Sequence, residues 1–219
     1  MNNKTLPFSS GVHDIKFLDH NEIRFTVSIP EEANYPSTAP NPLILILHYG
    51  GEPFPFYGRP LIEQLYLPNW NELGAIMVAP ESSGGAWSEP ENETRAIQLF
   101  QTILDAYKCD ARKTLVTGYS AGAIGAHYYA LNYPELFTAA IPIAGYPSHY
   151  IDLPVPARFL LSKDDELFPL KKFKDFFPES ESVLSPETVS VKVRSHYDVA
   201  NYGEAVRECI TWIRSQWNV

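Results

Sequence analysis

The sequence predicts an α/β fold in which helices cover both faces of a mostly parallel central sheet. Short apolar runs rich in β-branched residues alternate along the chain with longer segments of helical period, which is the pattern of such a sheet. One run, LILILH at 43–48, is apolar almost throughout, as is typical of a central strand buried on both faces. The chain has 219 residues, a length that one hydrophobic core can serve, so we expect a single domain over 1–219.

Seven segments have the composition of strands. The first, 22–30, alternates apolar and polar residues, so its apolar side chains share one face: Ile23, Phe25, Val27 and Ile29. The others follow in chain order at 43–48, 75–79, 114–117, 138–143, 158–161 and 189–193.

Three segments are predicted to be helices: 94–106 and 202–217 by their apolar spacing, and 121–131 as a helix of small residues. The first places on one face Ile97, Phe100, Ile103 and Leu104. The last carries a single apolar stripe of Val206, Cys209, Ile210, Ile213 and Trp217. The proline-rich segments 36–42 and 53–68 are expected to be surface loops of the same domain.

Charge and composition exclude several classes of protein. Lys and Arg number 17 against 26 Asp and Glu, a net charge of -9 that would repel nucleic acid and anionic membranes. The uncharged stretches 33–51 and 114–134 are too polar or proline-rich to insert stably in a bilayer, and the first residues lack a secretory or transit signal. We therefore expect a cytoplasmic protein. The sequence leaves open whether it forms a homodimer. Two cysteines, Cys109 and Cys209, are too few for a disulfide framework, although one disulfide stays open.

The strongest motif is Gly118-Tyr119-Ser120-Ala121-Gly122, which lies between a predicted strand and a predicted helix. A serine in such a tight turn projects its hydroxyl from the carboxyl edge of the sheet, while glycines on either side leave room for neighbouring elements. The pattern alone could be a glycine-rich turn of no function. Its place between strand and helix favours a nucleophile.

A serine nucleophile needs a base and a carboxylate, and both follow at the same edge of the predicted sheet. Strand 158–161 runs into a polar turn with Asp164 and Asp165, and strand 189–193 is followed by His196. The chain order Ser, Asp, His is that of hydrolases with this architecture. The remaining histidines fit solvent-exposed, structural or pocket-lining positions better: His13, His20, His48, His127 and His149.

Acyl transfer also needs hydrogen-bond donors for the oxyanion. The amide of Ala121, directly after the serine, is one expected donor. The second should come from the loop that follows strand 43–48, with Gly50 preferred and Gly51 as the alternative. Without the serine motif, this loop would be an ordinary strand-ending turn.

These motifs resemble the α/β-hydrolases, in particular the small esterase group of phospholipase/carboxylesterases, acyl-protein thioesterases, feruloyl esterases and predicted peptidases. The run from Asp165 to Pro169 resembles the acid turn of that group and favours Asp165 over Asp164. The resemblance implies Ser120 as nucleophile, His196 as general base and then acid, and Asp165 as the group that orients the imidazole, with no metal or cofactor. Tyr49 departs from it, because the group has glycine at that position.

The substrate is less defined by the sequence. Candidate substrate contacts are Tyr49, Gly51, Trp87 and Tyr119, and aromatic residues of 52–70 could line a pocket or simply pack the loop. Only a short segment separates strands 138–143 and 158–161, where larger relatives insert a lid, so we expect an open site without a large lid domain. A cluster at Lys171, Lys172 and Lys174 fits a solvated helix face.

The resulting hypothesis is a serine esterase that cleaves a small-molecule carboxylic ester through an acyl-enzyme on Ser120. A thioesterase or a peptidase would use the same residues with a different leaving group. A binding protein that retains the fold without turnover is the alternative from another class.

Overall fold

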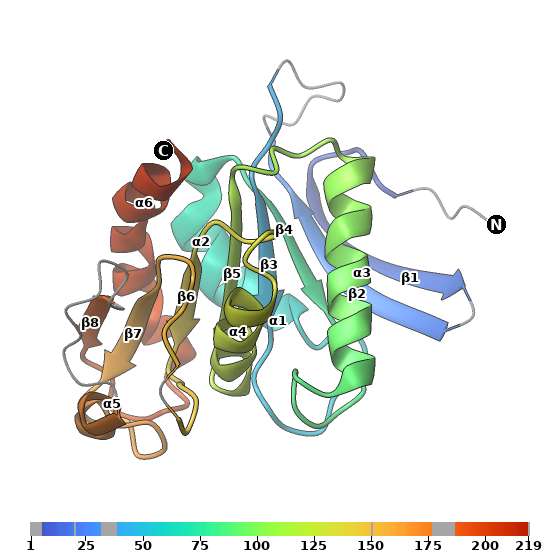
Figure 1. The fold of residues 1–219 in the computed structure, drawn as a ribbon. Coiled ribbons are helices and arrows are strands. Elements are labelled where there is room, and N and C mark those ends of the chain that lie inside the picture. The colour runs from blue at the N-terminus through green and yellow to red at the C-terminus, as the bar shows by residue number, and fades with distance from the viewer. Residues whose placement is uncertain (1–5, 20, 32–38, 150, 177–186, 219) are drawn as a thin grey trace.

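The computed structural model describes residues 6–19, 21–31, 39–149, 151–176 and 187–218 (Figure 1). One sheet of eight strands runs through them in the order β1-β2-β4-β3-β5-β6-β7-β8. The strands are β1 (Gly11–Asp19), β2 (Asn21–Ile29), β3 (Leu43–Leu47), β4 (Ile76–Pro80), β5 (Thr114–Tyr119), β6 (Ala140–Ile143), β7 (Arg158–Ser162) and β8 (Glu187–Val191). The pairs β1-β2 and β2-β4 are antiparallel and the other neighbours are parallel, which confirms the predicted mostly parallel sheet.

Helices cover both faces of this sheet (Figure 1). On one face lie α3 (Pro90–Ala106) and α4 (Ala121–Asn132), which pack on a core that includes the apolar face of β2. On the other lie α6 (Gly203–Trp217) and a helical segment made of α1 (Arg59–Leu61), η1 (Ile62–Tyr66) and α2 (Leu67–Trp70). Short turns η2 (Asn71–Leu73) and η3 (Val199–Tyr202) and helix α5 (Leu170–Phe176) complete the described elements.

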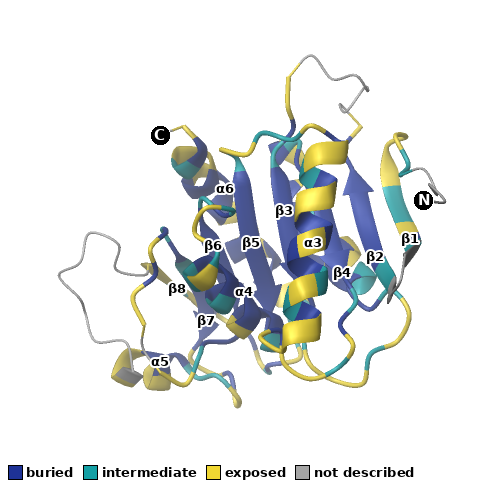
Figure 2. Cartoon of the chain, turned by 45° about the vertical axis from the view of Figure 1, so that its right-hand side comes forward, coloured by how far each residue is buried: buried dark blue, intermediate teal, exposed yellow. Residues whose placement is uncertain are grey.

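The apolar faces predicted for the long helices are confirmed. The stripe of α6 is buried along its length, and Ile97, Phe100 and Ile103 of α3 point into the opposite core. Figure 2 shows the central strands buried and the outward turns of α3 exposed. Because β3 and β5 are covered on both sides, every residue of both strands is buried, and β3 is apolar throughout.

The prediction of a surface loop at 53–68 is wrong in its second half, which is helical from Arg59 onward. Pro60 stands in the first turn of the segment, where the missing N–H costs no hydrogen bond, and Pro68 lies where the π-helical turn η1 passes into α2. The segment is held by buried apolar side chains: Leu61, Ile62, Leu65, Tyr66 and Trp70. In the other proline-rich segment, 36–42, residues 39–42 form neither helix nor strand, as predicted, while 36–38 lie outside the described residues, as does His20.

Strand β1 was not among the predicted strands. It pairs with β2 over its full length as an edge hairpin, and Ile15 is the side chain that it buries in the core. Its alternation of apolar and polar residues is confined to residues 13–17 and is broken at Leu18, so its strand signal is short. Other boundaries differ from the prediction by a few residues, and β8 begins and ends two residues earlier.

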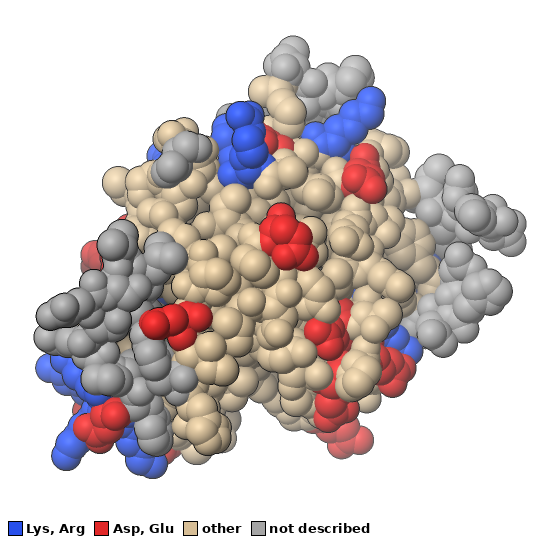
Figure 3. Space-filling view, viewed as in Figure 1, with Lys and Arg blue, Asp and Glu red and all other residues tan. Residues whose placement is uncertain are grey.

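Two smaller predictions concern the surface. The three lysines of α5 are exposed while Leu170 and Phe173 are buried, so the basic cluster is a solvated helix face; it lies at the lower left of Figure 3. Cys109 and Cys209 are free thiols and do not pair. None of the helices that the structure describes combines the length and apolar character needed to cross a bilayer.

Candidate active site

Ser120 lies in the turn between β5 and α4, in a strained backbone conformation. Its φ of 55° and ψ of -115° are unfavourable for a residue with a side chain, and such strain is concentrated at functional sites. The turn is held because the Ser120 amide donates to Ile143 O (2.9 Å) and the amide of Ala123 donates to Ser120 O (2.9 Å). A Cβ on Gly122 would lie 2.0 Å from Leu47 O, so the elbow can pass β3 only with glycine at this position.

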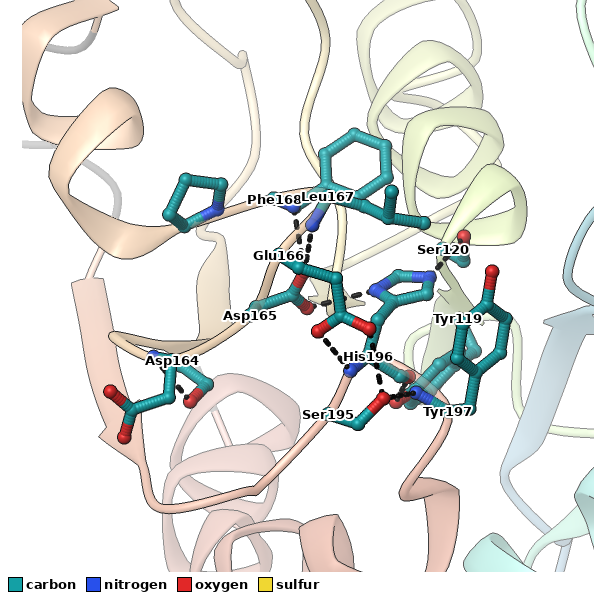
Figure 4. Close-up of polar contacts among 12 residues, drawn as sticks. Tyr119, Ser120, Asp164, Asp165, Glu166, Leu167, Phe168, Ser195, His196 and Tyr197 are labelled. Atoms are coloured by element: carbon teal, nitrogen blue, oxygen red, sulfur yellow. Dashed lines mark hydrogen bonds and ion pairs between the residues drawn. The ribbon is translucent and has the colours of Figure 1, made fainter.

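The structure brings Ser120, His196 and Asp165 into one hydrogen-bonded chain (Figure 4). His196 Nε2 lies 2.8 Å from Ser120 Oγ, and His196 Nδ1 lies 2.8 Å from Asp165 Oδ2. With the proton on Nδ1, the ring donates to the carboxylate and accepts from the serine hydroxyl. Asp164 is exposed and points away from His196, so Asp165 is the carboxylate at the imidazole.

Asp165 is buried, and its second carboxylate oxygen also accepts hydrogen bonds. Oδ1 accepts hydrogen bonds from the amides of Leu167 (2.8 Å) and Phe168 (2.7 Å). Burial opposes ionisation, but the hydrogen bonds from His196 and from these two amides outweigh it and hold the pKa of Asp165 below its usual value. The carboxylate therefore stays charged beside the imidazole.

The main chain of His196 is also fixed. The hydroxyl of Tyr119, the residue before the serine, donates to His196 O at 2.7 Å. Burial raises the pKa of this tyrosine, so the hydroxyl keeps its proton. Tyr119 lies along the pocket wall as predicted for a substrate contact, but its polar atom is already bound to the histidine loop.

The loop after β3 approaches the start of α4. A Cβ on Gly50 would lie 3.4 Å from the Cβ of Ala121, so the two expected oxyanion donors belong to adjacent backbone segments. Three successive carbonyls of this loop accept hydrogen bonds from side chains: Trp87 Nε1 donates to His48 O (3.0 Å), His48 Nδ1 to Tyr49 O (2.7 Å) and Tyr57 Oη to Gly50 O (3.2 Å). In turn, the amide of Ser82 donates to His48 Nε2 at 3.1 Å.

A pocket of about 870 Å³ opens at Ser120 and His196. Its other walls come from the loop after β3, the helical segment, the end of β5, the turn after β7 and the loop around η3: Tyr49, Gly50, Gly51, Gln64, Tyr119, Leu167, Tyr197, Asp198, Val199, Ala200 and Asn201. Gln64, Leu167 and the residues at 197–201 were not predicted. Gln64 lies in a segment expected to be a loop, and side chains that follow His196 carry no recognisable motif.

Trp87 does not line this pocket, contrary to the expectation of a substrate contact. It is buried, and its ring packs edge-on against His48 at a centroid distance of 4.8 Å. A Cβ on Gly125 would lie 2.6 Å from the Cβ of Trp87, so the tryptophan fills the space between the loop after β3 and α4. It can reach substrate only through the backbone that it holds.

The other histidines that the structure describes lie elsewhere. His13 contacts Ser9 O and His149 contacts Ser148, both at exposed positions, while His127 is buried with its pKa lowered by burial. Burial also lowers the pKa of His48, to about 4. No cluster of His, Cys, Asp or Glu within the described ranges is arranged to hold a metal ion.

Comparison with solved structures finds the same architecture. FphF, a fluorophosphonate-binding serine hydrolase of Staphylococcus aureus, superposes with a TM-score of 0.75 at 12% identity, covering 94% of this chain and 98% of that one. A ferulic acid esterase gives a TM-score of 0.73 at 16% identity over 95% and 98% of the two chains. A lidless serine hydrolase from Xanthomonas campestris gives 0.68 at 18% identity, covering 96% of this chain and 98% of its own. The fold is therefore that of the α/β-hydrolases, without a large lid.

Comparison with known sequences finds acetylxylan esterases. Acetylxylan esterase A of Emericella nidulans is 28% identical over 141 residues, which are 58% of this chain and 43% of that protein. The enzyme of the same name from Aspergillus awamori is 30% identical over 121 residues, or 49% and 38% of the two chains. The matches thus span about two fifths of these relatives. The model of the family described as putative esterase matches residues 72–198, more than half of the chain, and this protein therefore belongs to that esterase family.

Proposed function

We propose that this protein hydrolyses carboxylic esters through an acyl-enzyme formed on Ser120. The observation that carries the proposal is the continuous hydrogen-bonded chain from Ser120 Oγ through His196 to the buried carboxylate of Asp165, at the mouth of a pocket. Membership of an esterase family supports the same reaction class.

In the proposed reaction, Ser120 Oγ attacks the ester carbonyl while His196 Nε2 takes the hydroxyl proton. Asp165 stabilises the imidazolium that forms and keeps the ring in the orientation that presents Nε2. As the tetrahedral intermediate collapses, His196 returns the proton to the leaving alcohol. Water then enters by the same route and releases the acid, with His196 again as base.

The oxyanion would be bound by the amides of Ala121 and Gly50. Ala121 begins α4, so its N–H has no partner within the helix. In a trans peptide the N–H points opposite to the preceding C=O. Because Tyr49 O is turned to the His48 ring, the Gly50 amide is turned away from that ring, toward the side on which the pocket lies. By the same argument, the bond from Tyr57 to Gly50 O turns the Gly51 amide away from the Tyr57 hydroxyl, and Gly51 stays the alternative donor.

The open pocket places little restriction on the acyl group of the ester. The similar proteins suggest which substrates to try first. They are named for acetyl and feruloyl esters. Aromatic Tyr49 and exposed Tyr197 and Leu167 around the serine could contact a flat or apolar acid, while Gln64 and Asn201 could bind hydroxyl groups of an alcohol.

The test is covalent labelling combined with a substrate series. A fluorophosphonate probe should label the wild type at Ser120, and the Ser120→Ala variant should lose both labelling and ester turnover. Rates on p-nitrophenyl esters of increasing acyl length, beside a thioester and an aryl amide, would separate an esterase from a thioesterase or a peptidase. Full labelling of the alanine variant would refute Ser120 as nucleophile, and a wild type that turns over none of the substrates would favour a binding protein.

A further inference from the structure

The histidine of the proposed site is carried by a loop, not by a helix or strand. His196 lies between the end of β8 at Val191 and the start of η3 at Val199. A loop residue can keep Nε2 within 2.8 Å of Ser120 Oγ only if its main chain is held from outside. Tyr119 holds the carbonyl of His196, and the remaining question is what holds its amide.

The amide is held by Glu166, the residue directly after Asp165. Glu166 Oε2 accepts a hydrogen bond from His196 N at 2.9 Å, and Oε1 accepts one from Ser195 Oγ at 2.8 Å. Figure 4 shows the Glu166 carboxylate lying against the main chain of 195–196, while Asp165 contacts the imidazole ring. Two adjacent acids thus hold one histidine at different places, one at its side chain and one at its backbone.

The turn that bears both acids is itself fixed. The bonds from the amides of Leu167 and Phe168 to Asp165 Oδ1 close it into a compact loop, and the Glu166 carboxylate is bound in turn to His196 N and Ser195 Oγ. With the ring bound at one carboxylate and the backbone at the other, the rotation of the His196 side chain is defined. The hydrogen bonds from His196 N and Ser195 also hold the pKa of Glu166 below its usual value, so its charge persists in mildly acidic solution.

We infer that Glu166 is a positioning residue, whose carboxylate fixes the His196 loop so that the imidazole stays aligned between Ser120 and Asp165. The inference rests on the function proposed above for its effect on catalysis, but the fixing of the loop can be measured without any substrate. Misplacing a catalytic group by an ångström can cost up to about 100-fold in rate. Because Tyr119 and Asp165 would still hold the histidine, we expect a loss of about tenfold when the Glu166 carboxylate is removed.

Three variants test this. Glu166→Ala removes both hydrogen bonds, and because the residue is exposed, no core packing is lost and the fold should persist. Glu166→Gln keeps an oxygen that can accept from the His196 amide and an NH2 group that can donate to Ser195 Oγ. Asp164→Asn is the matched control: it removes the same charge two residues away, from an exposed side chain that points away from the histidine.

Two measurements are made on each variant. Hydrogen-deuterium exchange of the peptide covering 194–198 reports the loop directly. Steady-state kinetics on p-nitrophenyl acetate report kcat and KM separately. We expect Glu166→Ala to exchange faster in this peptide and to lose about tenfold in kcat with KM little changed. The Gln variant should recover most of both effects, and Asp164→Asn should match the wild type.

Unchanged exchange in Glu166→Ala would overturn the inference, and so would an equal loss of kcat in Asp164→Asn, because the effect would then come from charge alone. Failure of glutamine to improve on alanine would also contradict it. If the wild type hydrolysed no ester, the proposed function would fall, while the exchange data would still decide whether Glu166 holds the loop.

Discussion

Asp165 can be replaced by an amide of the same shape, and the structure determines which way that amide must face. Two main-chain N–H groups, those of Leu167 and Phe168, donate to Oδ1. In an Asp165→Asn variant only the carbonyl oxygen of the new side chain can accept these bonds. Its NH2 group must then face Nδ1 of His196, which lies 2.8 Å from Oδ2 in the wild type.

This orientation forces the wrong tautomer on the histidine. Nδ1 must accept from the asparagine, so the ring proton moves to Nε2, the atom that should take the proton of Ser120. In a serine protease triad the same replacement lowers kcat by about 10⁴-fold, which corresponds to about 5.4 kcal/mol of transition-state free energy. Because the shape and the two main-chain bonds are preserved, we expect the variant to stay folded.

The assay compares wild type, Asp165→Asn and Asp164→Asn in two reactions, turnover of p-nitrophenyl acetate and the rate of fluorophosphonate labelling. Both rates should fall by about 10⁴-fold in the first variant and stay near wild type in the second. Circular dichroism checks that each variant is folded. A loss of less than tenfold in Asp165→Asn would show that the tautomer argument is wrong, and a large loss in Asp164→Asn would move the acid to the neighbouring residue.

Other predictions concern the parts that hold the site. Trp87→Phe leaves the buried carbonyl of His48 without its indole donor. We therefore expect a loss of about 1 to 2 kcal/mol in the free energy of unfolding, measured by urea titration, and a lower kcat in steady-state kinetics. An unchanged kcat would mean that Trp87 does not hold the loop after β3 in place for catalysis. Gly122→Ala drives a Cβ into Leu47 O, and we expect a loss of about 3 kcal/mol or more, seen as a lower unfolding midpoint or insoluble protein; a midpoint equal to that of wild type would contradict the close approach. Burial lowers the pKa of His48 from 6.5 to about 4. As the pH falls, the imidazole of His48 is therefore protonated in the unfolded chain before it is protonated in the folded protein. The free energy of unfolding should drop by up to about 3 kcal/mol between pH 6.5 and 4. Urea titrations across this range should show a flatter dependence in His48→Gln, and equal slopes in the two proteins would argue against a buried neutral histidine.

Much of the fold follows from local sequence patterns. The continuous apolar run of β3 has that composition because both of its faces are covered, and the stripe of α6 exists because one face of that helix is buried. The helical segment 59–70 was not predicted, because its structure depends on long-range packing and not on a local pattern. Its prolines signal loops when read alone, and only packing of Leu65, Tyr66 and Trp70 against α6 makes the helical turns stable.

The three polar side chains of the candidate site were predictable, because they are of the types that such chemistry uses and each follows a predicted strand. Ser120, Asp165 and His196 each follow a strand, and parallel strands deliver such residues to one edge of the sheet. The choice between Asp164 and Asp165 came from resemblance, because both follow β7. The structure supplies the physical reason: Asp165 is buried and bound by two main-chain amides, while Asp164 is exposed.

Three side chains whose positioning role the sequence did not reveal share one property, which is that they bind main-chain atoms. Trp87 and Tyr57 hold carbonyls of the loop after β3, and Glu166 holds the amide of His196. Every residue offers the same backbone groups, so the partner of such a side chain leaves no mark in the sequence. Glu166 illustrates the consequence. Beside Asp165 it reads as one more acid in a polar turn, and its exposure suggests a solvated side chain. Its two hydrogen bonds, at 2.9 and 2.8 Å, are nonetheless close in length to the 2.8 Å bond between His196 and Asp165. The side chains of a hydrogen-bonded Ser-His-Asp chain can therefore be recognised from their chemistry. The groups that keep these side chains aligned have to be found from the path of the backbone.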